Sequence, residues 1–461
     1  MRHDELVALV LQLQRQLAER DRKVAELERL LEEARRGGKR QSAPFSRGGP
    51  KTNPKRPGRR KGAAYGRQAT RRVPPKVDEH VVVECPLFCP HCHGPVQVTG
   101  RADQYQTDIP RVRSFTRHFE IHYGRCTLCG KHVQKRDRRQ TSDALTVGTI
   151  QIGPVALGTV AHLNKVDGLS YGKAAALLER MYGLNVSRSA LARGLLRMAR
   201  KAAPSYEALK SQLRTAPVVY PDETGWKIGG QSAWLHEATD GKRTTVYAIE
   251  KGRGYPEAAL LLGKDYAGTI GSDGWAPYRK FEKATRQACL AHLLRRSGEL
   301  LETATRGSVR FPRAVKAILK KAFAVRDLRD AGLLSHRKLK AAKAQLDHEM
   351  GRLLVGTFTD EANRRFARHL SKLQEDLFRF VLRPELEGTN WPAETELRYA
   401  VVNRKTCGGG NRTAQGAAAQ AILMTVSRTA RKRSHDDISV FADLLRAPRS
   451  IVHPLLLTSP A

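Results

Sequence analysis

Apolar positions change their spacing along the chain, and the changes predict segments of different structure. From residue 216, "PVVYPDETGW", "SAWLHEATD" and "TTVYAIEKGRG" predict three strands separated by Gly-rich turns, followed by a helix in "YPEAALLLG" and a fourth strand in "YAGTIGSDGW". Residues 312–382 are rich in Ala, Leu, Arg and Lys, which predicts helices. "QGAAAQAILMTVSRTARKR" predicts a last helix, whose small residues allow close packing on a sheet. The expected fold class is therefore α/β.

Near the N-terminus, apolar residues repeat with the heptad spacing of a coiled coil. The a and d positions are occupied by Leu6, Val10, Leu13, Leu17, Val24, Leu27 and Leu31, with Arg20 interrupting one d position. Self-association through this seam is the first interpretation. An amphipathic helix that docks on its own protein is the alternative.

A pair of helices is predicted further along the chain. Residues 169–200 contain an Ala- and Leu-rich helix, a break at 183–186 and a second helix that Ser187 caps. This outline fits a helix-turn-helix in which Arg188, Arg193 and Arg197 contact DNA. Two packed helices of any helical subdomain would produce the same pattern, so that alternative stays open.

Charge points to a polyanionic partner. The 461 residues contain 82 Lys and Arg against 45 Asp and Glu, a formal charge of +37, and nucleic acid is the leading candidate. Residues 37–76 hold thirteen basic residues and no acid, punctuated by Gly, Pro and Ser, which predicts a disordered cationic linker. Contact with phosphates is favoured for it, and a solubilising spacer is the alternative. No apolar run is long enough to span a membrane, and no secretion signal is apparent.

Four of the seven cysteines form two C-x-x-C pairs. Cys89 and Cys92 lie in "CPHC", and Cys126 and Cys129 lie in "CTLC" after 33 intervening residues. Each tight turn presents two thiolates, so the two pairs together predict one structural Zn²⁺ in a zinc ribbon.

Carboxylates at the ends of two predicted strands suggest a second metal site. Asp222 is expected to end the first strand, and Asp273 the fourth. Together with an acid from a packed helix, they would hold two divalent ions about 4 Å apart, as phosphodiester chemistry requires. Metal would also explain why Glu394 stands in the basic neighbourhood "NWPAETELRYAVVNRK".

Several blocks resemble transposases of the insertion sequence 66 family. They are "YPDETGW", "GSDGWAPY", "CLAHLLRR" and the long block from Asn390 to Arg433, and the N-terminal helix, linker and zinc ribbon follow the family's layout. The resemblance implies a DDE transposase with an RNase H-like core and a helical insertion before the last acid. The family's Asn-Asn-x-Ala-Glu pattern aligns with "NWPAE", where this chain has Trp391 in place of the second Asn.

The resemblance implies that Asp222, Asp273 and Glu394 bind Mg²⁺ or Mn²⁺ as the catalytic triad. Glu223 and Glu396 are the competing acids, but residues two apart on a helix point about 200° apart, so Glu394 and Glu396 cannot both face the metals. Phosphate or core-supporting contacts are expected from Arg398, Arg404 and Lys405, with a solvated basic face as the alternative. "CLAH" contains Cys289 and His292, which are expected to have a structural or DNA-positioning role.

The implied reaction is hydrolysis at the element ends, followed by attack of a 3' hydroxyl on target DNA. Expected partners are DNA, a second or further copy of the chain and small accessory proteins, in the bacterial cytoplasm at the nucleoid and without membrane attachment. Two rivals remain: a transposase-derived DNA-binding protein without chemistry, and a metal-dependent nuclease that cuts without joining.

The expected fold is an RNase H-like mixed-sheet core with an all-helical insertion, preceded by a coiled-coil helix, a zinc ribbon and a helix-turn-helix-like region. The predicted segments are 1–36 (coiled-coil helix), 37–76 (linker), 77–135 (zinc ribbon), 140–212 (helical DNA-binding region), 213–298 (first part of the core), 299–385 (insertion), 386–435 (last part of the core, with Glu394) and 436–461 (C-terminal tail).

Overall fold

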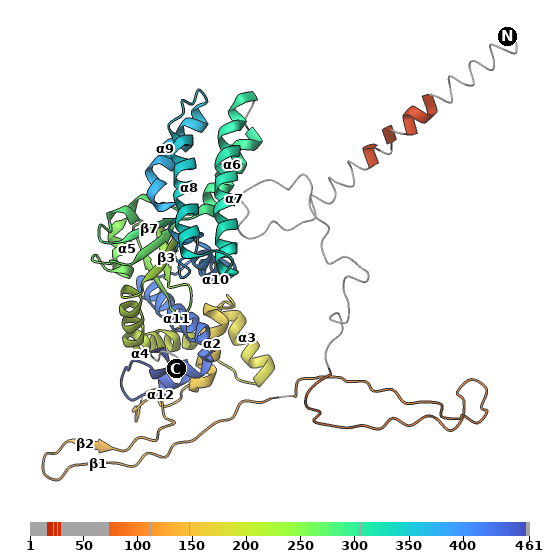
Figure 1. Ribbon diagram of the computed structural model, residues 1–461. Coiled ribbons are helices and arrows are strands. Elements are labelled where there is room, and N and C mark those ends of the chain that lie inside the picture. The colour runs from red at the N-terminus through yellow and green to blue at the C-terminus, as the bar shows by residue number, and fades with distance from the viewer. Residues whose placement is uncertain are drawn as a thin grey trace. The chain divides into compact units, whose positions relative to one another are not determined.

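A computed structural model describes residues 16–21, 23–24, 26–28, 73–110, 112–146, 148–303 and 306–457 (Figure 1). The chain divides into two compact units, residues 1–110 and 111–461. Most of the predicted coiled-coil helix and nearly all of the predicted linker lie outside the described residues. Those of residues 16–28 that are described are helical, and the side chains of Leu17, Val24 and Leu27 are exposed. Self-association through the seam remains a prediction.

The second unit contains a five-stranded mixed sheet with the order β5-β4-β3-β6-β7. Its strands are β3 Val218–Ile228, β4 Gln231–Thr239, β5 Thr245–Glu250, β6 Thr269–Ser272 and β7 Thr285–Ala288. Strand β4 pairs antiparallel with both β3 and β5, whereas β6 pairs parallel with both β3 and β7. A separate hairpin joins β1 Tyr123–Arg125 to β2 His132–Gln134.

Two details of the sheet differ from the prediction. Asp222 lies in the middle of β3 rather than at its end, because the strand continues to Ile228 in an antiparallel ladder with β4. Strand β7 was not predicted, because its sequence "TRQA" has neither an apolar run nor a clean alternation. The other predicted strands and the helix α5 Tyr255–Leu262 are confirmed.

Helix α11, Ala414–Lys432, closes the outer edge of the sheet. The hydroxyls of Thr425 and Thr429 accept hydrogen bonds from the backbone N–H groups of Tyr247 and Thr245 on β5, at 2.9 and 3.2 Å. Unpaired backbone groups of an edge strand invite aggregation, and these threonines satisfy two of them. The predicted close packing of this helix on the sheet is confirmed.

The helices that precede the sheet are α2 Pro154–Lys165, α3 Tyr171–Tyr182 and α4 Arg188–Arg214. Gly183 ends α3 with a positive φ of 67°, and the Ser187 side chain accepts a hydrogen bond from the Ala190 N–H at the start of α4, as predicted. Residues 436–461, predicted only as a tail, contain α12 Asp437–Arg446, whose Phe441, Leu444 and Leu445 are buried in the main core.

Most of the chain between β7 and the last part of the core is helical, as predicted. It contains α6 Leu290–Thr303, α7 Arg310–Asp330, α8 His336–Leu354 and α9 Glu361–Leu373, and their ribbons rise together beyond the sheet in Figure 1. These helices share a core that also includes Val218 and Tyr220 of β3. Helix α10, Trp391–Thr406, then returns the chain to the sheet. Within the described residues, no helix is long and apolar enough to cross a membrane.

Candidate active site

Asp222 and Asp273 lie at the same level of two neighbouring parallel strands. The last residue pair between β3 and β6 is Val219 with Ile270, and each aspartate lies three residues beyond it. Because side chains alternate between the faces of a sheet, this equal step places both carboxylates on one face. The Trp275 N–H donates to Asp273 Oδ1 at 2.9 Å, which orients the second carboxylate.

Glu394 lies in the first turn of α10, and a buried asparagine connects that turn to the sheet. Asn390 is fully buried, and its side-chain amide donates to the carbonyl of Pro221, the residue before Asp222, at 3.2 Å. Its backbone N–H donates to the Sγ of Cys289, directly after β7, at 3.1 Å. The hydrogen bonds of Asn390 to Pro221 and Cys289 therefore fix the start of α10 against β3 and against the end of β7.

The environment of Asp222 includes the charges of the other two carboxylates. Burial, followed by the charge of the adjacent Glu223, raises the pKa of Asp222 to about 8. The charges of Asp273 and Glu394 act in the same direction, against a backbone hydrogen bond from Glu223 that lowers the pKa. Asp222 thus lies within electrostatic range of the other two acids, from β6 and α10. A cation at this place would relieve the repulsion.

The competing acids have other partners. Glu223 accepts two hydrogen bonds from Arg253, at 3.0 and 2.8 Å, and one from the Tyr278 hydroxyl at 2.9 Å. Glu396 is buried and paired with Arg428 of α11. By contrast, the Glu394 side chain is 30% exposed and therefore accessible to a ligand.

His292 and Cys289 flank Glu394. The His292 Nε2 atom lies 3.9 Å from Glu394 Oε1, and the donor atoms of Cys289, His292 and Glu394 all lie within 4.8 Å of one another. The first turn of α6 therefore contacts the acid itself, a contact that is consistent with the supporting role expected for "CLAH".

Two side chains near the aspartates were not identified from the sequence. Glu237 of β4 is opposite Asp222 in the ladder and fully buried, and neither of its carboxylate oxygens has a hydrogen-bond partner among the described residues. Burial raises its pKa well above the ordinary value, which favours the protonated form. Arg253 lies between Trp234 and Trp275, with its guanidinium carbon 4.5 and 3.7 Å from the ring centres. Neither residue belongs to a recognisable motif, so no local signal could have found them.

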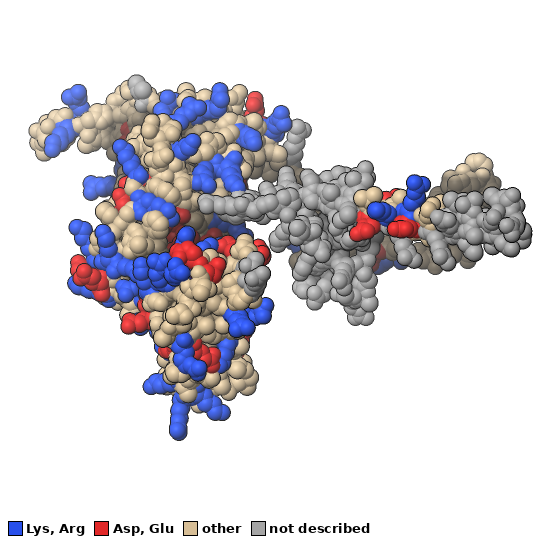
Figure 2. Space-filling model, turned by 90° about the horizontal axis from the view of Figure 1, so that it is seen from above, with Lys and Arg blue, Asp and Glu red and all other residues tan. Residues whose placement is uncertain are grey.

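The predicted DNA-contacting residues differ in accessibility. Arg188, Arg193, Arg398 and Lys405 are exposed, Arg404 is half-buried, and Arg197 is half-buried with its Nε atom enclosed. Arg197 is therefore less available to DNA than its position in the sequence suggested. On the described surface in Figure 2, Lys and Arg side chains are widely distributed and cover more area than Asp and Glu.

The two C-x-x-C turns have the same backbone geometry. The N–H of Cys89 donates to the Gly94 carbonyl and that of Cys126 to the Lys131 carbonyl, at 2.8 and 2.9 Å. In both turns, backbone N–H groups that point at the first sulfur lower the pKa of its thiol, which favours the thiolate that zinc requires. The two pairs belong to different units of the chain. A shared four-cysteine zinc site thus remains a prediction.

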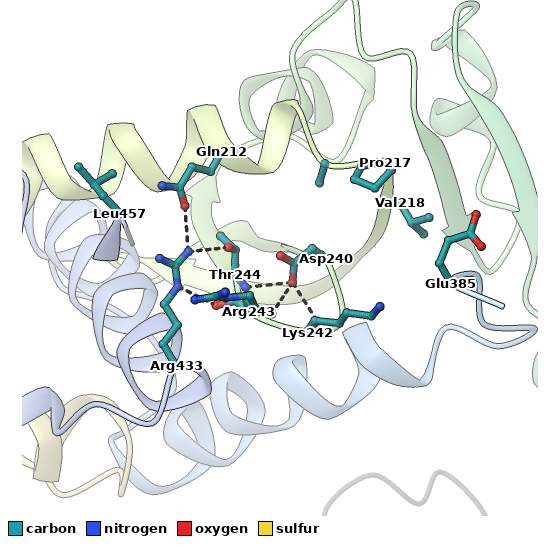
Figure 3. Close-up of a pocket in the computed structure, with 11 residues that line it drawn as sticks. Gln212, Pro217, Val218, Asp240, Lys242, Arg243, Thr244, Glu385, Arg433 and Leu457 are labelled. Carbon is teal, nitrogen blue, oxygen red and sulfur yellow. Dashed lines mark hydrogen bonds between the residues drawn. The ribbon is translucent and has the colours of Figure 1, made fainter. Parts of the chain in front are cut away.

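A pocket of about 390 Å³ lies at the start of β3 and the β4–β5 turn, and it shares no residue with the carboxylate cluster (Figure 3). Its polar groups hold the turn together. Asp240 Oδ1 accepts backbone hydrogen bonds from residues 242–244, and Arg433 donates to Gln212 and Thr244 at 2.9 and 3.1 Å. We assign no function to it.

Comparison with known families places these observations in context. A family model described as Transposase IS66 family matches residues 149–419, which is more than half of the chain. The matched segment contains Asp222, Asp273 and Glu394. No curated protein matches the chain. The family match confirms the resemblance seen in the sequence blocks, and this chain belongs to the IS66 family of transposases.

Proposed function

We propose that this chain is a DDE transposase that cuts the ends of its element and joins the 3' hydroxyl to target DNA. The observation that carries the proposal is the convergence of Asp222, Asp273 and Glu394, which come from a strand, a strand end and a helix that are far apart in sequence. In this proposal the three carboxylates are the catalytic triad, and the core that holds them is RNase H-like. The order β5-β4-β3-β6-β7, with three antiparallel strands followed by two parallel ones, supports that fold.

The donor set fits a hard divalent cation. Mg²⁺ and Mn²⁺ prefer carboxylate oxygens, and a cation would relieve the unfavourable effect of the Asp273 and Glu394 charges on Asp222. Asp222, Asp273 and Glu394 would hold the metal, which would supply activation of the attacking oxygen and stabilisation of the departing one. The raised pKa of Asp222 is the expected property of such a ligand in the absence of metal.

The surrounding residues would position these carboxylates. Asn390 fixes the start of α10 against β3, which would orient Glu394 toward the aspartates. Arg253 neutralises Glu223 and stacks on Trp275, two residues after Asp273, which holds the loop after β6. His292 of α6 lies close to Glu394, with its Nε2 atom 3.9 Å from Glu394 Oε1.

Binding of DNA would involve several parts of the chain. Arg188 and Arg193 of α4, together with Arg398, Arg404 and Lys405 of α10, would contact phosphates. The C-x-x-C turns would bind structural Zn²⁺, the basic linker would add non-specific affinity, and the N-terminal helix would pair two copies at the two element ends. Small accessory proteins of the same element would be further partners.

The test is cleavage and joining of labelled DNA that carries the ends of the element, in Mg²⁺ or Mn²⁺. Glu394→Gln removes one carboxylate without changing side-chain shape, and Glu302→Gln on the exposed end of α6 is the matched control. We expect joined products from the wild type and the control, and none from Glu394→Gln.

Other outcomes would distinguish a transposase from the two alternative functions. Cut but unjoined DNA would indicate a nuclease, and binding without cutting by every variant would indicate a DNA-binding protein without chemistry. Joining by Glu394→Gln at the wild-type rate would contradict the triad.

A further inference from the structure

Trp391 is an exposed aromatic side chain three residues before Glu394. It is the first residue of α10 and is 59% exposed. Among the described residues of 148–457, no other large aromatic side chain is classed as exposed. The remaining tryptophans of this part of the chain are engaged, since Trp226 is buried and Trp234 and Trp275 enclose Arg253.

The ring of Trp391 lies on the same stripe of α10 as Glu394. Residues three apart on a helix are neighbours, with about 5–6 Å between their Cβ atoms. Arg398 lies seven residues after Trp391 on this stripe, and its guanidinium carbon is 5.8 Å from the ring centre. An aromatic ring, a proposed metal ligand and a cation therefore follow one another along one side of the helix.

The surroundings of the ring favour a nucleobase over an apolar protein surface. Protein interfaces bury clustered apolar and aromatic side chains. Trp391 is the only exposed large apolar side chain among the described residues of α10, and its ring neighbour is a cation. Every base has a π-face that can stack on an aromatic ring, and single-strand binding sites combine such rings with basic side chains.

We infer that Trp391 stacks on an unpaired base of the DNA strand next to the phosphodiester bond held at Asp222, Asp273 and Glu394. This inference rests on the proposed function and adds a base-binding subsite to it. Because a base inside a duplex is not accessible to the ring, the DNA must be locally opened beside the site. The subsite would tolerate any base, since stacking requires no particular hydrogen-bonding edge.

The experiment combines protein and DNA changes in a double-mutant cycle. The full chain is bound to element-end DNA in Ca²⁺ in place of Mg²⁺, and single abasic nucleotides are scanned across the end. Trp391→Ala is compared with Trp391→Phe and with Val355→Ala, a matched removal of an exposed apolar side chain at the end of α8, 86% exposed. Thermal unfolding of each variant verifies that it is folded.

We expect Trp391→Ala to bind intact DNA about 5- to 150-fold more weakly, whereas Trp391→Phe and Val355→Ala bind nearly as the wild type does. At one abasic position the loss should vanish, because the base that the ring contacts is already missing. Equal losses at every abasic position, or no loss on intact DNA, would overturn the inference. The latter result would instead favour a protein partner for the ring.

Cleavage in Mg²⁺ is measured separately on the same DNA, so that the inference and the proposed function can fail independently. If the binding loss of Trp391→Ala vanishes at one abasic position but no DNA is cleaved, the base subsite is supported and the transposase chemistry is not. If DNA is cleaved but the loss is the same at every abasic position, the chemistry is supported and the base subsite is not.

Discussion

The carboxylate of Glu396 is held by the guanidinium of Arg428, with Nε–Oε2 and Nη2–Oε1 distances of 2.9 and 3.2 Å. Both side chains are nearly inaccessible, at 4% and 10% exposure. Glu394, only two residues earlier on α10, is instead 30% exposed, and its charge acts on Asp222. One helix therefore presents one acid to the core and one acid to the candidate metal site.

Substitution of these two acids should have opposite consequences. Glu396→Ala leaves the Arg428 cation buried without its partner, so we expect it to lower the free energy of unfolding by about 3–5 kcal/mol. Glu394→Gln removes one of several crowded acids and should leave stability unchanged or slightly higher while abolishing joining. Urea unfolding and the joining assay measure the two effects. A destabilised Glu394→Gln would argue that this side chain is structural.

Stabilisation by metal should increase with pH. The pKa of Asp222 is raised from 3.8 to about 8, so the folded metal-free protein binds a proton there that the unfolded chain has lost, and its stability decreases as pH rises through that window. Bound metal requires the carboxylate and offsets this penalty. We expect the increase in melting temperature caused by Mn²⁺ to be small near about pH 6 and clearly larger near about pH 8. Asp222→Asn should show no such pH dependence; a wild-type shift independent of pH would contradict the assignment.

Arg253→Lys should impair turnover more than stability. The planar guanidinium stacks between Trp234 and Trp275 and donates twice to Glu223, and a Lys ammonium cannot reproduce this geometry. We expect kcat to decrease by about 10- to 100-fold, because the loop after β6 is less well positioned, with little change in DNA affinity. Arg326→Lys is the matched control, since Arg326 stacks on Phe323 in the helical insertion. Equal effects of the two substitutions would refute a positioning role.

His162 should make the pairing of α2 with α12 pH-sensitive. Its Nδ1 atom lies 2.9 Å from Asp437 Oδ2, and this hydrogen bond raises the pKa of the imidazole above 6.5. A raised histidine pKa means that the stabilisation is fully present below about pH 6.5 and is lost as pH rises through the folded-state pKa. The stability difference between the wild type and His162→Gln should therefore shrink from about pH 6 to about pH 8. A constant difference in urea unfolding would show that the pair does not titrate.

Metal content should report on the C-x-x-C turns. We expect the purified chain to contain one Zn²⁺ and Cys126→Ser to lose it, because a four-thiolate site tolerates no missing ligand. Cys85→Ser is the matched control, since Cys85 is an exposed cysteine outside both pairs. Elemental analysis after chelation of loosely bound metal gives the stoichiometry. Equal zinc in Cys126→Ser and the wild type would exclude the shared site.

The sequence by itself determined the local elements of this protein. Apolar alternation indicated the strands between residues 218 and 272, and a Gly and a capping Ser indicated the break between α3 and α4. Helical periodicity showed that the side chains of Glu394 and Glu396 point in different directions. These features depend on neighbours within a few residues, and such neighbours are visible in any sequence.

Only the tertiary structure decided which distant groups meet. The extent of β3 beyond Asp222 depends on its pairing with β4, the short β7 is a strand because β6 lies beside it, and α12 forms where it can bury its apolar face. Asn390 joins Pro221 and Cys289, and Arg253 neutralises Glu223. Contacts between residues that are 30 to 170 positions apart produce no repeating pattern in the sequence. Their energy depends on how distant segments pack in three dimensions, and not on the order of residues within one segment.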